Sequence, residues 1–146
     1  MSCELQLQPA AAASLARWHQ FVEQKDLSGL PGLLHPQAVF RSPVAYKPYS
    51  GAPVVSLILN TVIKVFVDFT YHRELVTVDG LSVVLEFSAK VAGRDLKGID
   101  LIRFDEEGKI VEFEVMVRPM SGLQALGEEM GRRLAPFLSA GKPDSN

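Results

Sequence analysis

The sequence has little of what supports a disulfide framework, a metal centre or a membrane span. It has one cysteine, Cys3, so neither an internal disulfide nor a cysteine-based structural zinc site can form. The most apolar stretch, residues 54–67, is interrupted by polar side chains and is too short to cross a bilayer. Residues 1–20 contain Glu4 and lack the basic segment of a secretory signal. We therefore expect a cytoplasmic protein with no membrane partner.

An excess of charge of one sign is also missing. The chain has 15 Lys and Arg against 17 Asp and Glu, which gives a formal net charge of −2. That balance does not favour a nucleic-acid partner. The sequence contains no phosphate-binding glycine loop, no nucleophile elbow and no closely spaced pair of metal ligands. We therefore predict neither a cofactor nor a metal, and we expect His19, His35 and His72 at the surface or in loops.

What is present is enough apolar sequence for one core. The chain has 146 residues, of which 47% are hydrophobic, and roughly 150 residues is a typical domain length. We predict a single domain over residues 10–138. The segments 1–9 and 139–146 are predicted to be flexible tails.

Helical patterns dominate the first part of the chain. Apolar residues recur at helical spacing in the N-terminal segment, at Ala11, Leu15, Trp18 and Val22. A short second helix is predicted over residues 27–34, with Asp26 as its N-cap. A third helix is predicted after Ser50, its proposed cap, with Pro53 in the first turn. A final helix is predicted over residues 121–138.

Strand patterns dominate the second half. Apolar and polar residues alternate through residues 81–91, which predicts a strand with one buried face. Asp79 and Gly80 form a hairpin turn signal before it, so residues 69–78 should be its partner strand. Two further strands, 96–104 and 111–117, complete an antiparallel meander, and residues 35–43 predict a short earlier strand.

This order of elements predicts an α+β fold. We expect a cone-shaped α+β barrel, in which a curved antiparallel sheet carries three N-terminal helices over its concave face and a C-terminal helix beside it. Such an arrangement leaves a pocket between the sheet and the helices.

Asp100 is the most informative polar residue. On the predicted strand it shares a face with apolar residues, namely Leu96, Ile102 and Phe104. Burial without a nearby cation raises the pKa of a carboxyl group, because a low dielectric disfavours the charged form. A neutral acid in that place could donate a hydrogen bond or a proton near neutral pH. The alternative is a structural aspartate paired with an arginine or a backbone amide, and the spacing leaves both open.

The segment from Gly98 to Ile110, GIDLIRFDEEGKI, resembles the I-D-x-x-R-F-D-x-x-G-K-I segment of the nuclear transport factor two-like superfamily. The runs LARWHQFVEQKDLSGL (15–30) and VFRSPVAYKPYSG (39–51) match the same pattern in the same order. The resemblance covers roughly residues 10–120. Its closest functional branches are ketosteroid isomerase and the SnoaL-like polyketide cyclases, although the superfamily also contains non-catalytic binders.

The resemblance implies roles for three residues. In ketosteroid isomerase a protonated aspartate and a tyrosine donate hydrogen bonds to the dienolate oxygen. Asp100 matches that aspartate and Trp18 matches the tyrosine, which makes both candidate catalytic residues. An indole N–H can donate one hydrogen bond but is a weaker acid. Ser42 matches the proton-shuttling aspartate, and a serine hydroxyl cannot act as that base unaided. Isomerisation by the route of that enzyme is therefore not expected.

The candidate ligand pocket includes further apolar residues. The resemblance implies pocket walls at Val115 and Val117. The same resemblance, together with strand alternation, adds Phe40, Leu85 and Phe87. With Trp18, Ser42 and Asp100 these residues make up the predicted pocket. Leu85 and Phe87 could equally be ordinary core residues.

Three functions remain open. The first is an enzyme on a small hydrophobic ring or polyketide-like molecule, with Asp100 as general acid or oxyanion donor. The second is a non-catalytic small-molecule-binding or dimeric scaffold domain, which Ser42 favours. The third is a protein-binding adaptor, for which no large apolar surface motif is seen. We also predict a homodimer, because Val84, Ile99 and Leu101 would leave apolar surface on the convex face of the sheet.

Overall fold

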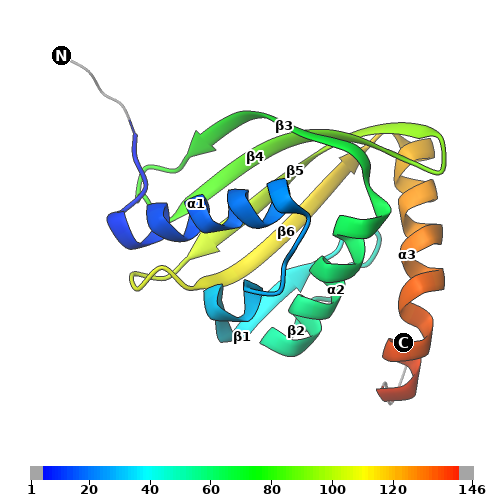
Figure 1. The fold of residues 1–146 in the computed structure, drawn as a ribbon, viewed down its shortest axis with the longest axis horizontal. Helices are drawn as coiled ribbons and strands as arrows, with labels where there is room; N and C mark the ends of the chain where they lie inside the picture. The colour runs from blue at the N-terminus through cyan, green and yellow to red at the C-terminus, as the bar shows by residue number, and fades with distance from the viewer. Residues whose placement is uncertain (1–4, 142–146) are drawn as a thin grey trace.

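The computed structural model describes residues 5–141, so Cys3 and parts of both predicted tails lie outside the described residues. Figure 1 shows a curved sheet with helices α1 and α2 on one side of it and α3 at one end. The fold is mixed α+β, as predicted, and the sheet is open, because its strand order runs from one free edge to another. Within these residues no helix is long and apolar enough to cross a membrane.

The first helix, α1 (Pro9–Gln24), matches the predicted apolar stripe. Proline occupies its first position, where the missing N–H costs nothing. Ala11, Leu15 and Trp18 are buried against the sheet. The helix ends at Lys25, which adopts a left-handed conformation at φ 53°. Residues 5–8 precede this helix, and the Gln8 N–H donates to the carbonyl of Gly80.

The predicted second helix, residues 27–34, is wrong as an α-helix. The structure has only a short 3-10 helix, η1 (Leu30–Leu33), and the next strand begins at Leu34. Gly29, Pro31 and Gly32 disfavour a regular helix in this segment, and a Cβ atom at Gly29 would lie 2.8 Å from the Phe21 ring. Asp26 accepts a hydrogen bond from the Ser28 N–H rather than capping a longer helix.

The third helix, α2 (Ala52–Val65), begins later than predicted. Gly51 is its N-cap, at φ 108°, and Ser50 instead lies in a two-residue strand, β2 (Tyr49–Ser50). The β-branched end of the segment stays helical through Val65. Ile63 and Val65 are buried there, and this burial outweighs the modest cost of β-branched residues in a helix.

The sheet has the strand order β2-β1-β6-β5-β4-β3. The predicted meander is confirmed as β3 (Val67–Val76), β4 (Ser82–Val91), β5 (Arg94–Phe104) and β6 (Ile110–Arg118), which pair antiparallel in sequence order. The earlier strand, β1 (Leu34–Arg41), runs parallel to β6.

Alternation along the strands gives the sheet two different faces. Leu85, Asp100 and Val115 are aligned across β4, β5 and β6 on the concave face, which the helices cover. Val84, Leu101 and Glu114 are aligned on the convex face. The core therefore lies between the concave face and the helices.

The last helix, α3 (Met120–Gly141), packs against α2 and against β4, β5 and β6. It extends past residue 138, where the domain was predicted to end. Figure 1 shows that it stands along one end of the sheet. It thus closes the space between the sheet and α2 on that side.

Candidate functional site

A cavity lies between the concave face of the sheet and the helices. Its volume is about 210 Å³, which is many times the roughly 15 Å³ that a single water needs. Asp100 is the only Asp, Glu, Lys, Arg or His residue among its lining residues. The wall is otherwise almost wholly apolar, with contributions from α1, α2, α3 and the sheet: Val22, Leu27, Phe40, Ile58, Leu59, Val62, Ile63, Phe66, Phe69, Phe113, Val115, Leu126, Met130 and Leu134.

Three side chains form a hydrogen-bonded chain at the buried end of the cavity. The Tyr71 hydroxyl on β3 donates to Oδ2 of Asp100 on β5 over 2.6 Å. The Trp18 indole N–H on α1 donates to the Tyr71 oxygen over 3.0 Å. Trp18 also packs edge-on against Phe113, with ring centroids 5.2 Å apart. Packing and hydrogen bonds together fix the position of Asp100.

The surroundings of Asp100 shift its acidity. Asp100 is only 6% exposed, and its burial raises the pKa from 3.8 to about 7, although the Tyr71 hydrogen bond pulls the pKa down in part. Burial, with the nearby Asp100 charge, raises the pKa of Tyr71 well above its usual value. At neutral pH Tyr71 is therefore a neutral hydrogen-bond donor, and Asp100 exists in both its neutral and charged forms.

The second carboxyl oxygen of Asp100, Oδ1, has no side-chain donor of its own in the described part of the chain. Among the side chains that the structure describes, no buried nitrogen or oxygen lacks a hydrogen-bond partner. Asp100 accepts its hydrogen bond at Oδ2, so Oδ1 is not sealed inside the protein. Because Asp100 lines the cavity, Oδ1 can reach a ligand there, as an acceptor when charged and as a donor when protonated.

The structure brings together five of the predicted pocket residues. Trp18, Phe40, Ser42, Asp100 and Val115 all line the cavity. The indole N–H of Trp18, its one side-chain donor, donates to Tyr71. It is therefore not available to a ligand in this arrangement. The Ser42 oxygen accepts the Val44 N–H over 3.1 Å.

The other predicted pocket residues lie elsewhere. Leu85 and Phe87 are 1% and 0% exposed, and they belong to the core behind the cavity wall rather than to its lining. Val117 lines a separate shallow depression with Glu86, Lys97 and Met116. Strand alternation places a side chain on a face, but it cannot tell a residue beside a cavity from one packed against a neighbour.

The histidines do not line the cavity. His19 lies 3.3 Å from Glu74 across the gap between α1 and β3. The ring nitrogen of His35 accepts the Gln37 N–H. His72 shares a 2.8 Å hydrogen bond with Ser88. All three contacts are exposed to solvent.

Tyr71, the hydrogen-bond partner of Asp100, was missed by sequence reasoning. The predicted strand 69–78 contained it, and alternation would have put Phe69 and Tyr71 on one face. Nothing in the spacing pairs Tyr71 with Asp100, however, because β4 lies between their strands. The β3–β4 register also shifts between Tyr71 and Glu74, so counting along β3 does not predict its facing residues.

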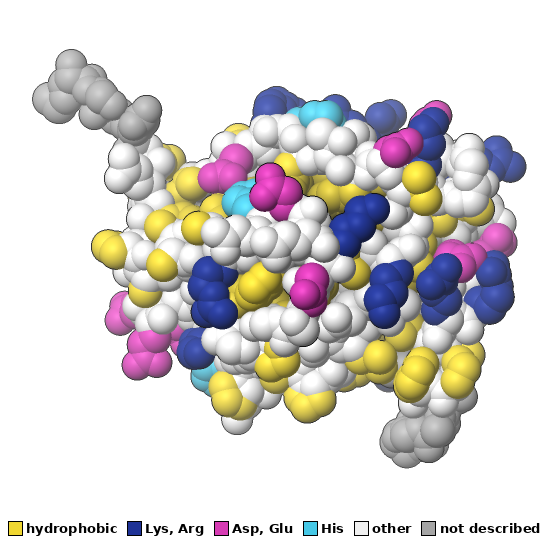
Figure 2. Space-filling model, viewed as in Figure 1, with side chains coloured by type: hydrophobic (Ala, Val, Ile, Leu, Met, Phe, Trp, Pro, Cys, Tyr) yellow, Lys and Arg dark blue, Asp and Glu magenta, His cyan; other side chains and the backbone are white. Residues whose placement is uncertain are grey.

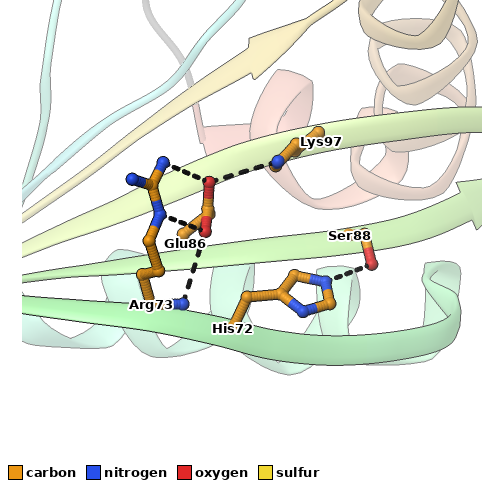
Figure 3. A network of polar contacts seen from close by, with 5 residues as sticks. All are labelled: His72, Arg73, Glu86, Ser88 and Lys97. Atoms are coloured by element: carbon orange, nitrogen blue, oxygen red, sulfur yellow. Dashed lines mark hydrogen bonds and ion pairs between the residues drawn. The ribbon is translucent and has the colours of Figure 1, made fainter.

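A second polar cluster lies on the convex face, away from the cavity. Glu86 accepts hydrogen bonds from the backbone N–H and the guanidinium of Arg73. It also forms an ion pair with Lys97, as Figure 3 shows. Its side chain is only 10% exposed, and the Arg73 and Lys97 cations lower its pKa to about 2. This Glu86 cluster ties β3, β4 and β5 together.

Figure 2 shows the side of the molecule on which α1 lies. There, charged side chains of both signs are scattered rather than gathered in one patch.

Comparison with known proteins gives the family. The model of the SnoaL-like domain matches residues 15–113. The chain belongs to the SnoaL-like domain family. This agrees with the resemblance to the nuclear transport factor two-like superfamily carried by residues 98–110. No curated protein matches the chain.

Solved structures extend the comparison. One is the crystal structure of a steroid delta-isomerase from Pseudomonas aeruginosa, whose sequence is 70% identical to this one. The match covers 93% of this chain and 99% of that chain, with a TM-score of 0.89. A bacterial protein with a cystatin-like fold from Silicibacter pomeroyi is 34% identical over 89% of this chain and 88% of that one, with a TM-score of 0.80. An epoxide hydrolase/cyclase-like enzyme of salinomycin pyran-ring formation shares the fold at 18% identity, over 77% of this chain and 92% of that one, with a TM-score of 0.63.

Proposed function

We propose that this SnoaL-like protein binds a small, uncharged hydrophobic molecule, of the ring or polyketide-like class, in the cavity beneath α1, α2 and α3. Asp100 holds one oxygen of that molecule and acts as general acid or oxyanion donor in an isomerase- or cyclase-type reaction. The observation that carries this proposal is Asp100 itself, a buried carboxyl at the end of an apolar cavity with Tyr71 as its side-chain partner.

The chemistry follows from the two protonation states of Asp100. In its neutral form the carboxyl donates a hydrogen bond to a carbonyl or epoxide oxygen and stabilises negative charge that develops there. Inside a low-dielectric cavity such a donor is worth more than in water. The buried acid also disfavours an anionic ligand, because like charges would meet without solvent. An uncharged ligand with one oxygen fits these constraints.

The resemblance to a steroid delta-isomerase supports a steroid as the first molecule to test. The cavity lacks the second carboxylate of the ketosteroid isomerase pattern, because Ser42 stands at that position. Ser42 therefore favours a second candidate function, the binding of such a molecule without turnover. The two candidates share the ligand and differ in whether a proton moves from one ring carbon to another.

Binding of testosterone by titration calorimetry tests the shared part of the proposal. We expect binding that weakens as pH rises through about 7, because ionised Asp100 no longer donates to the ketone. The Asp100→Asn variant keeps an N–H donor and should bind with no such pH dependence. Failure of the wild-type protein to bind neutral ring ketones at any pH would overturn the proposal.

Turnover separates the two candidates. The assay offers a Δ5-3-ketosteroid and follows its conjugated Δ4 isomer by ultraviolet absorbance. On the enzyme hypothesis a C4–H bond breaks and a C6–H bond forms, and a group other than Ser42 must carry the proton between the two carbons, because a serine hydroxyl is not a sufficient base unaided. The enzyme hypothesis predicts a rate that Asp100→Leu abolishes. Binding of the steroid with no conversion of this steroid or of a polyketide-like substrate would favour the binder.

A further inference from the structure

Helix α3 carries a glycine that the packing of the chain does not explain. Glycine is less favourable than alanine inside a helix because its backbone loses more freedom on folding. A side chain at Gly122 would lie 2.7 Å from Leu96, and one at Gly127 would lie 3.1 Å from Val44. Close packing therefore accounts for these two glycines. A Cβ atom at Gly131 would meet nothing of the described chain within 4 Å apart from its sequence neighbours and the backbone of its own helix.

Gly131 is a cavity-lining residue that is also open to solvent. It lines the cavity together with Met130 and Leu134 on α3, and it is itself exposed to solvent. Asp100, in contrast, is buried. The cavity thus runs from a closed end at Asp100 to an open end beside the bare backbone of α3.

We infer that Gly131 is a specificity-determining residue, past which the far end of a rigid, elongated, uncharged ring molecule extends when its oxygen reaches Asp100. This inference rests on the proposed function. The missing side chain leaves room at the open end, and the apolar residues beside Gly131 match a hydrocarbon body rather than a charged one. A short ligand that stays near Asp100 does not use this space.

The experiment compares two neutral ketones of different length on one set of variants. Testosterone is tetracyclic and 1-tetralone is bicyclic, and titration calorimetry measures the binding of both. Gly131→Leu should lower testosterone affinity roughly tenfold or more, which is the range expected for a few extra carbon atoms in an apolar site. Its affinity for 1-tetralone should not change. Gln124→Leu puts the same side chain on an exposed position of α3 outside the cavity and should alter neither affinity.

A second variant separates an effect on the binding site from a loss of folding. Gly131→Ala should raise the melting temperature, because alanine favours the helix, and it should weaken testosterone binding less than leucine does. Unchanged testosterone affinity in folded Gly131→Leu, with wild-type binding intact, overturns the inference and leaves the proposed function standing. Equal weakening of both ketones would also overturn it. If the wild-type protein binds neither ketone, the proposed function and the inference fall together.

Discussion

The Tyr71 hydroxyl and Oδ2 of Asp100 lie 2.6 Å apart although strand β4 separates the strands that carry them. Both side chains project from the concave face, and Tyr71 reaches across β4 to the carboxyl. Trp18 contacts the same hydroxyl from α1. Residues from α1, β3 and β5, which are distant in sequence, therefore come together around the carboxyl group of Asp100 and influence its pKa.

Tyr71→Phe removes the hydrogen bond that stabilises the charged form of Asp100. We expect the pKa of Asp100 to rise further above about 7, since burial then acts without that opposing contact. The variant should also lose about 1–3 kcal/mol of stability, because the Trp18 N–H loses its acceptor. Carbon-13 NMR of the side-chain carboxyl measures the pKa. Trp18→Phe is the control, because it leaves the Tyr71 donor in place, and an equal rise in that variant would contradict the assignment.

Asp100 should make the wild-type protein less stable as pH rises. Its pKa is about 7 in the folded protein against 3.8 ordinarily, so the folded state holds the proton more tightly than the unfolded chain. The stabilising contribution is full below pH 3.8 and is lost as pH rises to about 7, by an amount on the order of a few kcal/mol. Urea unfolding from pH 4 to 8 measures it.

Asp100→Asn is the matched variant for that profile. Asparagine keeps the shape and can accept the Tyr71 hydrogen bond, but it does not titrate in this range. The decline in the free energy of unfolding between pH 4 and 7 should therefore flatten. A variant that keeps the full wild-type slope would show that another group causes the decline.

The contribution of Glu86 to stability should depend on pH with the opposite sign to that of Asp100, and Glu86→Gln removes this contribution. Its pKa is lowered from 4.5 to about 2 by Arg73 and Lys97, so its contribution to stability is present above pH 4.5 and is lost as pH falls to about 2. The variant should be less stable than wild type at pH 7, and the two should converge in acid. Thermal melts at a series of pH values measure this. A constant difference at every pH would mean that the carboxylate charge is not what stabilises the Glu86 cluster.

The homodimer stays a prediction, and the convex face offers a surface for it. Ile99 lies opposite Met116 in the β5–β6 register, and Met116 is 48% exposed. An apolar strip beside the Glu86 cluster is a surface that a second copy of the chain would cover. Sedimentation should give a dimer at micromolar concentration, and Met116→Asp should shift it toward monomer. A monomeric wild-type protein would contradict this prediction.

The sequence predicted the meander and singled out Asp100, because both depend on regular periods, but it left open whether Asp100 is a buried acid or a paired structural aspartate. Alternation through residues 81–91 and the turn at Asp79 and Gly80 fixed the order and direction of the strands. Asp100 stood out as a carboxylate among apolar residues of one strand. These signals are local, and tertiary packing agreed with them.

Features that depend on contacts between distant segments could not be predicted in the same way. The Tyr71 partner of Asp100 comes from a strand two positions away in the sheet. Ser50 has the chemistry of a helix cap, but pairing with Val39 holds it in β2. Leu85 and Phe87 alternate as pocket residues would, yet neighbouring side chains fill the space above them.

Titration of Asp100 in the ligand-free protein tests the central claim most directly. Selective carbon-13 labelling of aspartate and NMR from pH 3 to 9 give the pKa of this one carboxyl, assigned by its absence in Asp100→Asn. The structure predicts a value of about 7. A value near 4, the ordinary range of an aspartate, would contradict the account of a buried acid available as a donor at neutral pH.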